Sequence, residues 1–226
     1  MSIAHGKLGI VTESQVARPA SPRRRQARGE RRIQQLLDAA ASVFCRTGYT
    51  SASTNAIARE AGVSPGTLYQ FFPNKEAIAV ELGDRLTQQM RDTHGVVFTD
   101  ENAALPLGEM LDVVLDPLIE FNCANPVFLT LICSSDTPGT VAEEHAALHA
   151  ALQTRVEELI GTYVPELTPE RRTRIATMAF ALFKAGLELI LSHEGEDREA
   201  YITEMKNCLY GYLAPVIGTE AAPARH

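Results

Sequence analysis

The sequence lacks the features that mark a secreted or membrane-spanning protein. Its four cysteines lie far apart and form no CxxC pair, a usage typical of reduced thiols in a cytosolic protein rather than of a disulfide framework. The longest stretch without Asp, Glu, Lys or Arg has only 15 residues, 121–135, whereas a spanning helix needs about 20 apolar residues. The first ten residues contain no apolar core of a secretory signal. We therefore expect a cytoplasmic chain with no membrane partner.

Signals of catalysis are equally scarce. The sequence contains no P-loop, dinucleotide-binding fingerprint or nucleophile elbow. His145 and His149 stand four residues apart, which is the spacing of a metal-binding pair on a helix. No third ligand is evident, and two solvated or core-edge histidines are the simpler interpretation. We expect no enzyme, no metal site and no cofactor.

The composition is that of an ordinary globular protein, but its charge is divided. The 226 residues are 45% hydrophobic and 22% charged, which excludes whole-chain disorder. Residues 1–75 contain eleven Lys and Arg against four Asp and Glu, a net charge of +7. Because the total is −7, the remainder carries −14. Such asymmetry suggests a module that binds polyanions, joined to a carrier that does not.

Helical periodicity covers the chain from residue 31 onward. Apolar residues recur at spacings of three and four, and no segment indicates a strand. Glycines, prolines and capping residues separate about nine expected helices. Their approximate ranges are 31–47, 54–61, 65–72, 75–94, 106–124, Val127–Cys133, 141–164, 170–193 and 198–217. The sequence predicts an all-α fold, with a three-helix N-terminal domain and a larger helical bundle after it.

Residues 50–82 have the pattern of a helix-turn-helix. Short helices flank the sequence AGVS, in which Gly62 permits the sharp turn. Ser64 and Pro65 are suited to the N-cap and first position of the next helix. Gly66 allows close approach of the backbone, and Thr67 and Tyr69 place hydroxyl groups on the outer face. The segment therefore favours DNA binding through the helix expected at residues 65–72, which is the third helix of the chain.

The same segment resembles the DNA-binding domain of the TetR (tetracycline-repressor) family of bacterial regulators. The resemblance covers about 47 residues and is highly specific, whereas the remaining two-thirds matches only in helix count and order. The matching residues are Phe44, Gly48, Tyr49, Thr54, Ile57, Ala58, Ala61, Gly62, Val63, Ser64, Gly66, Thr67, Leu68, Tyr69, Phe72, Lys75 and Glu76.

The resemblance implies that the third helix enters the major groove of double-stranded DNA with a palindromic operator. Thr67, Tyr69 and Lys75 would contact phosphates. The DNA-binding set that it implies is Ser53, Thr54, Asn55, Ser64, Pro65, Gly66, Thr67, Tyr69, Gln70 and Lys75. Because this helix has few strong base readers, we also expect contacts from Arg23, Arg24, Arg25 and Arg28. A merely solvated, Arg-rich tail is the alternative for this segment.

The last two helices carry more apolar surface than one small core needs. The resemblance implies that they form a four-helix bundle with a second copy, which gives a homodimer. Burial within one chain is the alternative for any single residue. The seam candidates are Met178, Leu182, Ala185, Gly186, Leu189, Met205, Leu209 and Tyr212.

Apolar residues between positions 96 and 164 are candidates for an effector pocket. The resemblance places an inducer between the central helices of the C-terminal domain, although plain core packing explains any one residue as well. The candidates are Phe98, Met110, Leu111, Val114, Phe121, Phe128, Leu131, Ile132, His145 and His149. Asn122 and Thr130, with the two histidines, would orient a mainly apolar small-molecule effector.

These features predict four segments and one leading function. The segments are a basic, disordered arm at 1–28, a helix-turn-helix domain at 29–77, a ligand-binding and dimerisation domain at 78–218 and a disordered tail at 219–226. The leading function is that of a repressor released from its operator by a small, mainly apolar ligand. A regulator that responds to a protein partner or a redox signal, for which Cys208 is the foremost sensor, is the alternative.

Overall fold

The computed structural model describes residues 22–133 and 137–220, and in these ranges all regular structure is helical. This confirms the all-α class. Ten helices are formed: α1 Pro22–Ser51, α2 Thr54–Glu60, α3 Pro65–Tyr69, α4 Lys75–Val97, α5 Asp100–Ala103, α6 Leu107–Ala124, α7 Val127–Cys133, α8 Gly139–Tyr163, α9 Pro169–Ser192 and α10 Gly195–Ile217. The additional helix is α5, which lies in an expected loop and is capped by Thr99.

Helix α1 begins at Pro22, so residues 22–28 are helical rather than part of a disordered arm. Proline is favoured at a first helical position, and the Arg, Gln, Ala and Glu residues that follow are good helix formers. Apolar periodicity marks only the side of a helix that is buried, and it therefore missed these turns. Within α1 the backbone angle φ is positive at Gly48, at 75°. This glycine directly follows the residue at which the first helix was expected to end.

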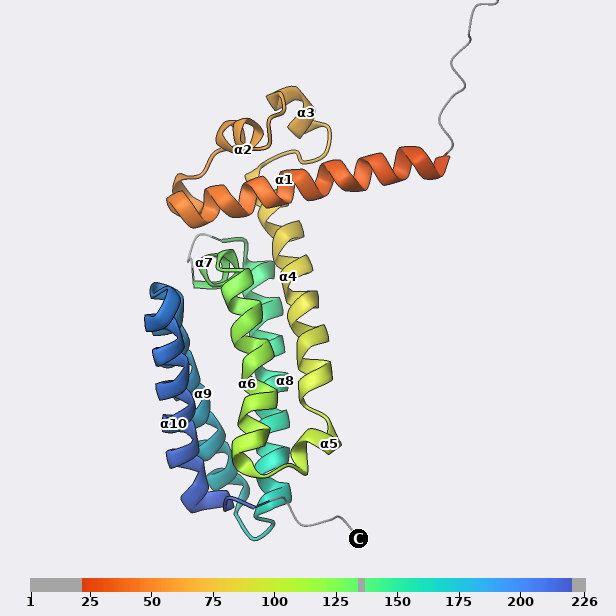
Figure 1. The fold of residues 1–226 in the computed structure, drawn as a ribbon. Coiled ribbons are helices and arrows are strands. Elements are labelled where there is room, and N and C mark those ends of the chain that lie inside the picture. The colour runs from red at the N-terminus through yellow and green to blue at the C-terminus, as the bar shows by residue number, and fades with distance from the viewer. Residues whose placement is uncertain (1–21, 134–136, 221–226) are drawn as a thin grey trace, which may run out of the picture.

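The molecule consists of an N-terminal domain, α1–α3, and a C-terminal domain that begins with α4 (Figure 1). Helix α1 lies across the end of the C-terminal bundle, and α2 and α3 lie on the far side of α1. The first core is built from buried apolar side chains of α1–α4: Leu36, Leu37, Phe44, Ile57, Ala58, Leu68 and Ile78. Because Ile78 belongs to α4, the same core joins the two domains.

The C-terminal domain packs α9 against both α8 and α10, and α4 against α6 and α8. The short helix α7 packs against α1 as well as against α4 and α8. It therefore lies where the bundle meets the N-terminal domain (Figure 1).

One described helix, α9, is long and apolar enough to cross a membrane by length and composition alone. The sequence had indicated no such segment because Lys184 and Glu188 interrupt its apolar run. A single helix of this kind is weak evidence for a membrane, and α9 packs against α8 and α10 as a bundle helix does. Only 22% of its most apolar stretch is buried, however.

Candidate nucleic-acid interface

Two serine caps set the geometry of the helix-turn-helix. The hydroxyl of Ser53 accepts a hydrogen bond from the Ala56 amide at 3.2 Å, and the hydroxyl of Ser64 accepts one from the Thr67 amide at 3.1 Å. Between the two helices Gly62 has φ of 65°, a conformation that glycine adopts without steric cost. The expected cap at Ser64 and the expected turn at Gly62 are confirmed, and Ser53 caps α2 in the same way.

A surface rich in hydroxyl groups connects α2 and α3. The hydroxyls of Thr54 and Tyr69 lie 3.0 Å apart, and those of Ser64 and Thr67 lie 2.9 Å apart. Tyr69 is 51% exposed although it is a large aromatic side chain. Other expected contact residues are exposed beside them: Ser53, Asn55, Pro65, Gly66 and Gln70. The structure thus brings the expected α2 and α3 residues onto one exposed surface.

Lys75 has a structural role that its assignment as a phosphate contact did not include. Its Nζ donates hydrogen bonds to the carbonyl oxygens of Tyr49 at 2.9 Å and Thr50 at 3.1 Å. The same atom lies 4.5 Å from the centre of the Tyr49 ring, within the range of a cation–π interaction. An ammonium group has three donors, so one remains for another acceptor. Lys75 therefore ties the first turn of α4 to the end of α1.

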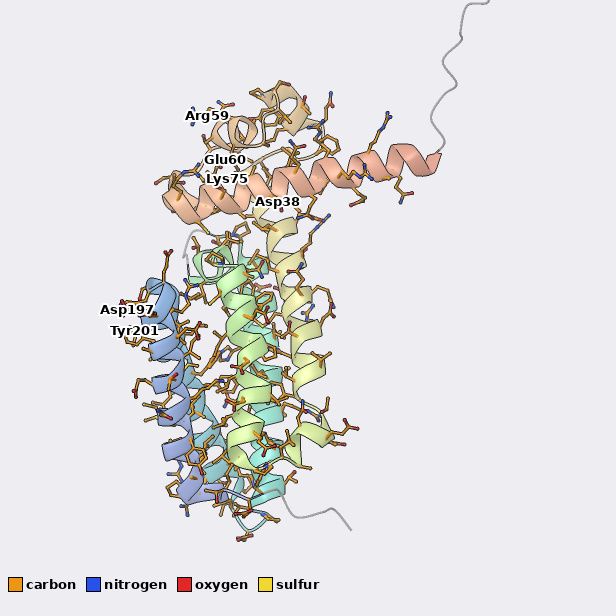
Figure 2. All side chains as sticks on the ribbon, in the orientation of Figure 1. Asp38, Arg59, Glu60, Lys75, Asp197 and Tyr201 are labelled. Carbon is orange, nitrogen blue, oxygen red and sulfur yellow. The ribbon has the colours of Figure 1, made fainter. Side chains whose placement is uncertain are left out.

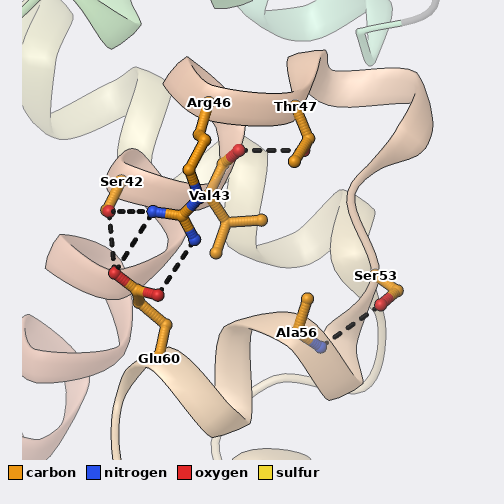
Figure 3. A network of polar contacts seen from close by, with 7 residues as sticks. All are labelled: Ser42, Val43, Arg46, Thr47, Ser53, Ala56 and Glu60. Atoms are coloured by element: carbon orange, nitrogen blue, oxygen red, sulfur yellow. Dashed lines mark hydrogen bonds and ion pairs between the residues drawn. The ribbon is translucent and has the colours of Figure 1, made fainter.

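A polar cluster fixes α2 against α1 (Figure 3). Arg46 and Glu60 form an ion pair with an Nη2–Oε2 distance of 2.9 Å, and the Ser42 hydroxyl donates to Glu60 at 2.8 Å. Arg46 also donates to the Ser42 hydroxyl at 3.0 Å. Hydrogen bonds from Arg46 and Ser42 lower the pKa of the Glu60 carboxyl. These contacts hold Glu60 on the α1 side of α2, away from the exposed hydroxyl surface.

Two further arginines are exposed in the N-terminal domain. Arg59 is exposed on the last turn of α2 (Figure 2), and the sequence analysis had not assigned it. Its position directly after the buried pair Ile57 and Ala58 is the signal that would have identified an outward side chain. Arg28 is exposed on α1, whereas the side chains of Arg23, Arg24 and Arg25 lie outside the described residues.

Two adjoining cavities lie among the described helices of the C-terminal domain. The first has a volume of about 230 Å³ and is lined from α4, α6, α7, α8 and α9; its lining includes Met90, His94, Asn122, Phe128, His149 and Lys184. The second, about 90 Å³, has an entirely apolar lining that includes Phe98, Met110, Leu111, Val114, Leu209 and Leu213. The two share Leu118, Leu152, Phe180 and Phe183. The larger cavity therefore has polar groups in its lining, and the apolar cavity lies on the other side of these four shared side chains.

The expected pocket residues fall into three groups. Phe98, Met110, Leu111 and Val114 line the apolar cavity, and Phe128 and His149 line the larger one. Phe121 and Leu131 are buried in the core instead, where Phe121 packs edge-on against Phe128, because helical periodicity cannot separate core-facing from cavity-facing positions. The side chains of Ile132 and His145 lie outside the described residues.

The lining residues that the sequence analysis missed come mainly from α4 and α9. His94 continues the buried stripe Leu82, Leu86 and Met90 at a spacing of four, and this spacing was the available signal. Burial and the nearby His149 lower the pKa of His94 to about 4. Burial and the charge of Lys184 lower the pKa of His149. Both shifts favour the neutral imidazole.

Comparison with known proteins covers both domains. Residues 36–82 match the family model described as bacterial regulatory proteins, tetR family. Residues 105–217 match the model of the tetracyclin repressor-like C-terminal domain. The chain belongs to the TetR family of transcriptional regulators.

The relatives of this TetR-family regulator are themselves transcription regulators. The uncharacterized HTH-type regulator YhgD of Bacillus subtilis is 25% identical over 172 residues, which cover 70% of this chain and 82% of that protein. A TetR-like regulator from Rhodococcus has a TM-score of 0.65 at 20% identity, covering 81% of this chain and 96% of that chain. FadR from Bacillus subtilis in complex with stearoyl-CoA has a TM-score of 0.57 at 18% identity, covering 82% and 98%.

In this TetR-family chain the expected seam residues divide between two surfaces. Met178 and Leu189 are 49% and 45% exposed, Ala185 is exposed and Leu182 is half-buried. Met205 and Leu209, in contrast, are buried within the chain's own core, and Gly186 lies against the Met205 side chain. For Met205 and Leu209 the structure shows the alternative of burial within one chain, because periodicity identifies an apolar face but not its partner. Tyr212 is half-buried and packs against the same core.

Proposed function

We propose that this TetR-family regulator is a homodimeric repressor that binds a palindromic operator and is released from it by a small, mainly apolar ligand. The observation that carries the proposal is the position of α7. Phe128 and Leu129 on α7 line the larger cavity, and the same helix packs against α1. A ligand in the cavity would therefore contact α7, which packs against α1 of the N-terminal domain.

The DNA contacts in this proposal come from the exposed surface of α2 and α3. Hydroxyl groups and cations fix a protein on the phosphate backbone, whereas base edges supply specificity. Thr54, Thr67 and Tyr69 offer the hydroxyls, and Arg59 and Lys75 offer positive charge. Gln70 is the exposed side chain on this surface best suited to a base edge.

In this proposal the chain forms a homodimer through α9, and the two-fold symmetry of the dimer matches that of a palindromic operator. Met178, Leu182, Ala185 and Leu189 are spaced by four, three and four residues, so they occupy one face of α9. Most of this face is uncovered in the single chain, although α9 contains a stretch apolar enough to cross a membrane by length and composition. Pairing of this face with its copy would bury it and place two N-terminal domains on successive half-sites.

Two helices, α7 and α4, would transmit ligand binding to the N-terminal domain. Helix α7 contacts both the cavity and α1. Met90 and His94 of α4 line the same cavity, and the N-terminal end of α4 is held by Lys75 to the last turn of α1. A ligand that separates α4 from α7 would tilt each N-terminal domain. The spacing of the two domains would then no longer fit the operator. The cavity favours this route over a purely redox signal.

The proposal is tested by fluorescence anisotropy of the full-length protein with DNA from upstream of its own gene. We expect binding that saturates at two chains per site, and loss of binding in Thr67→Ala. Thr203→Ala, an exposed threonine on α10, is the matched control and should bind normally. Replacement of Leu152, shared by both cavities, with Trp should abolish release by any effector while DNA binding persists. Failure to bind any DNA from this region would overturn the proposal.

A further inference from the structure

The polar groups that line the larger cavity are nitrogen-bearing side chains. His94 from α4, His149 from α8 and Lys184 from α9 converge on it, together with the amide of Asn122 from α6. Among the described residues that line it there is no Asp or Glu, although the chain beyond residue 75 carries a net charge of −14. A local concentration of nitrogen donors in an acidic domain favours an anion.

These groups lie within electrostatic range of one another. His149 influences the titration of His94, and Lys184 influences that of His149. The side-chain amide of Asn122 donates to the Leu118 carbonyl at 2.8 Å, which fixes its orientation at the cavity wall. The His149 ring also packs against Phe180 with ring centres 5.0 Å apart. The polar groups therefore form one cluster beside an aromatic wall that leads to the second cavity.

The second cavity determines what must be attached to the anion. Its described lining contains only apolar side chains, and it shares four of them with the first cavity: Leu118, Leu152, Phe180 and Phe183. A bound molecule that fills both regions needs a charged end and a hydrocarbon end. Volumes of about 230 Å³ and about 90 Å³ place the combined space near the lower limit for small-molecule sites, roughly 300 Å³.

We propose that the effector is an anionic amphiphile: a free carboxylate bound by His94, His149 and Lys184, with an unbranched hydrocarbon tail that extends past Phe183 into the second cavity. This inference rests on the proposed function and specifies the chemistry of its ligand. A carboxylate accepts several charge-assisted hydrogen bonds, and the tail gains from burial of apolar surface.

Binding of the carboxylate should take up protons. Burial lowers the pKa of both histidines, which favours their neutral forms. An adjacent anion favours the charged imidazolium. In the described lining the titratable groups facing the site are these histidines and Lys184, because α6 and α7 contribute only Asn122 and apolar side chains. Binding should therefore strengthen as pH falls from 8 to 6.

The experiment is isothermal titration calorimetry of the full-length protein with decanoate, 1-decanol and decanoyl-CoA, which share one tail but differ in the head. We expect decanoate to bind at least tenfold more tightly than decanol at pH 6. Its affinity should fall about threefold to tenfold by pH 8, while that of decanol stays constant. Titrations in buffers of different ionisation enthalpy should report proton uptake for decanoate alone.

Lys184→Gln tests the head group directly, and Arg174→Gln, an exposed cation elsewhere on α9, is its matched control. We expect the Lys184 variant to lose about threefold to tenfold in affinity for decanoate and nothing for decanol, and the control to lose neither. Equal or tighter binding of decanol or of decanoyl-CoA would overturn the carboxylate assignment while the ligand-released repressor stands. Absence of binding by all three would also overturn it, and DNA binding by the same preparation separates that result from failure of the proposed function.

Discussion

Lys75 at the start of α4 donates a hydrogen bond to the carbonyl oxygen of Tyr49 and lies over the ring of the same residue, with Nζ 4.5 Å from the ring centre. One side chain thus joins the first helix of the bundle to the end of α1. We expect Lys75→Ala to lower the free energy of unfolding by about 1–2 kcal/mol, because it removes two hydrogen bonds and a cation–π contact. Denaturant unfolding of the two proteins measures the difference.

The same variant tests the role of Lys75 at DNA. Because the ammonium group has a third donor beyond its two hydrogen bonds within the protein, Lys75→Ala should weaken binding to all sequences alike and reduce the salt slope of the affinity by about 1. Lys206→Ala, which breaks an ion pair between α10 and α6, is the control for loss of a bridging lysine. An unchanged slope would show that Lys75 acts only within the protein.

Tyr69→Phe isolates one hydroxyl group of the interface. The side chain is 51% exposed and its hydroxyl pairs only with the half-buried Thr54 in the described contacts, so its removal should leave the melting temperature within about 1 °C. We expect a threefold to tenfold loss of operator affinity, since a hydrogen bond to phosphate contributes roughly 1 kcal/mol. Tyr210→Phe, 39% exposed on α10, should change neither. Normal operator affinity of Tyr69→Phe would remove Tyr69 from the interface.

The N-terminal domain was largely predictable because its residues carry local signals. Ser53, Ser64 and Gly62 occupy positions whose backbone chemistry demands a cap or a left-handed turn, and the structure gives each of them that role. The role of Lys75 toward Tyr49 was not predictable, because the two residues are 26 positions apart.

The cavity and the seam were predictable only in part, because they depend on which helices face one another. Apolar spacing placed Met205 on a buried face but did not distinguish α9 of the same chain from α9 of a second copy. Met110 and Val114 were expected at a pocket, whereas Lys184 was missed because a lysine interrupts an apolar stripe. Its place at the cavity follows from the packing of α9 against α8.

The depressed pKa of His94 makes stability depend on pH. Burial and His149 lower it to about 4, from an ordinary value near 6.5. Between these values the unfolded chain binds more protons than the folded one, so stability rises with pH. We expect a loss of about 1–2 kcal/mol on acidification from pH 7 to pH 5, because a partly solvated site realises only part of the roughly 1.4 kcal/mol per pKa unit. Urea unfolding of the wild type and of His94→Gln measures it, and equal pH dependence of the two would contradict the assignment.

The exposed apolar face of α9 supplies the sharpest test of assembly. Lysines at Met178 and Leu189 would place two charges on a face that pairing should desolvate, so the double variant should sediment as a monomer and lose at least tenfold in operator affinity. Val96→Lys is the matched control, because Val96 is 68% exposed at the end of α4, away from α9. Both variants alter surface positions and should retain the helical content of the wild type. A dimer that survives in the Met178 and Leu189 variant would place the seam on another surface, and Tyr210 on α10 would be the next position to change.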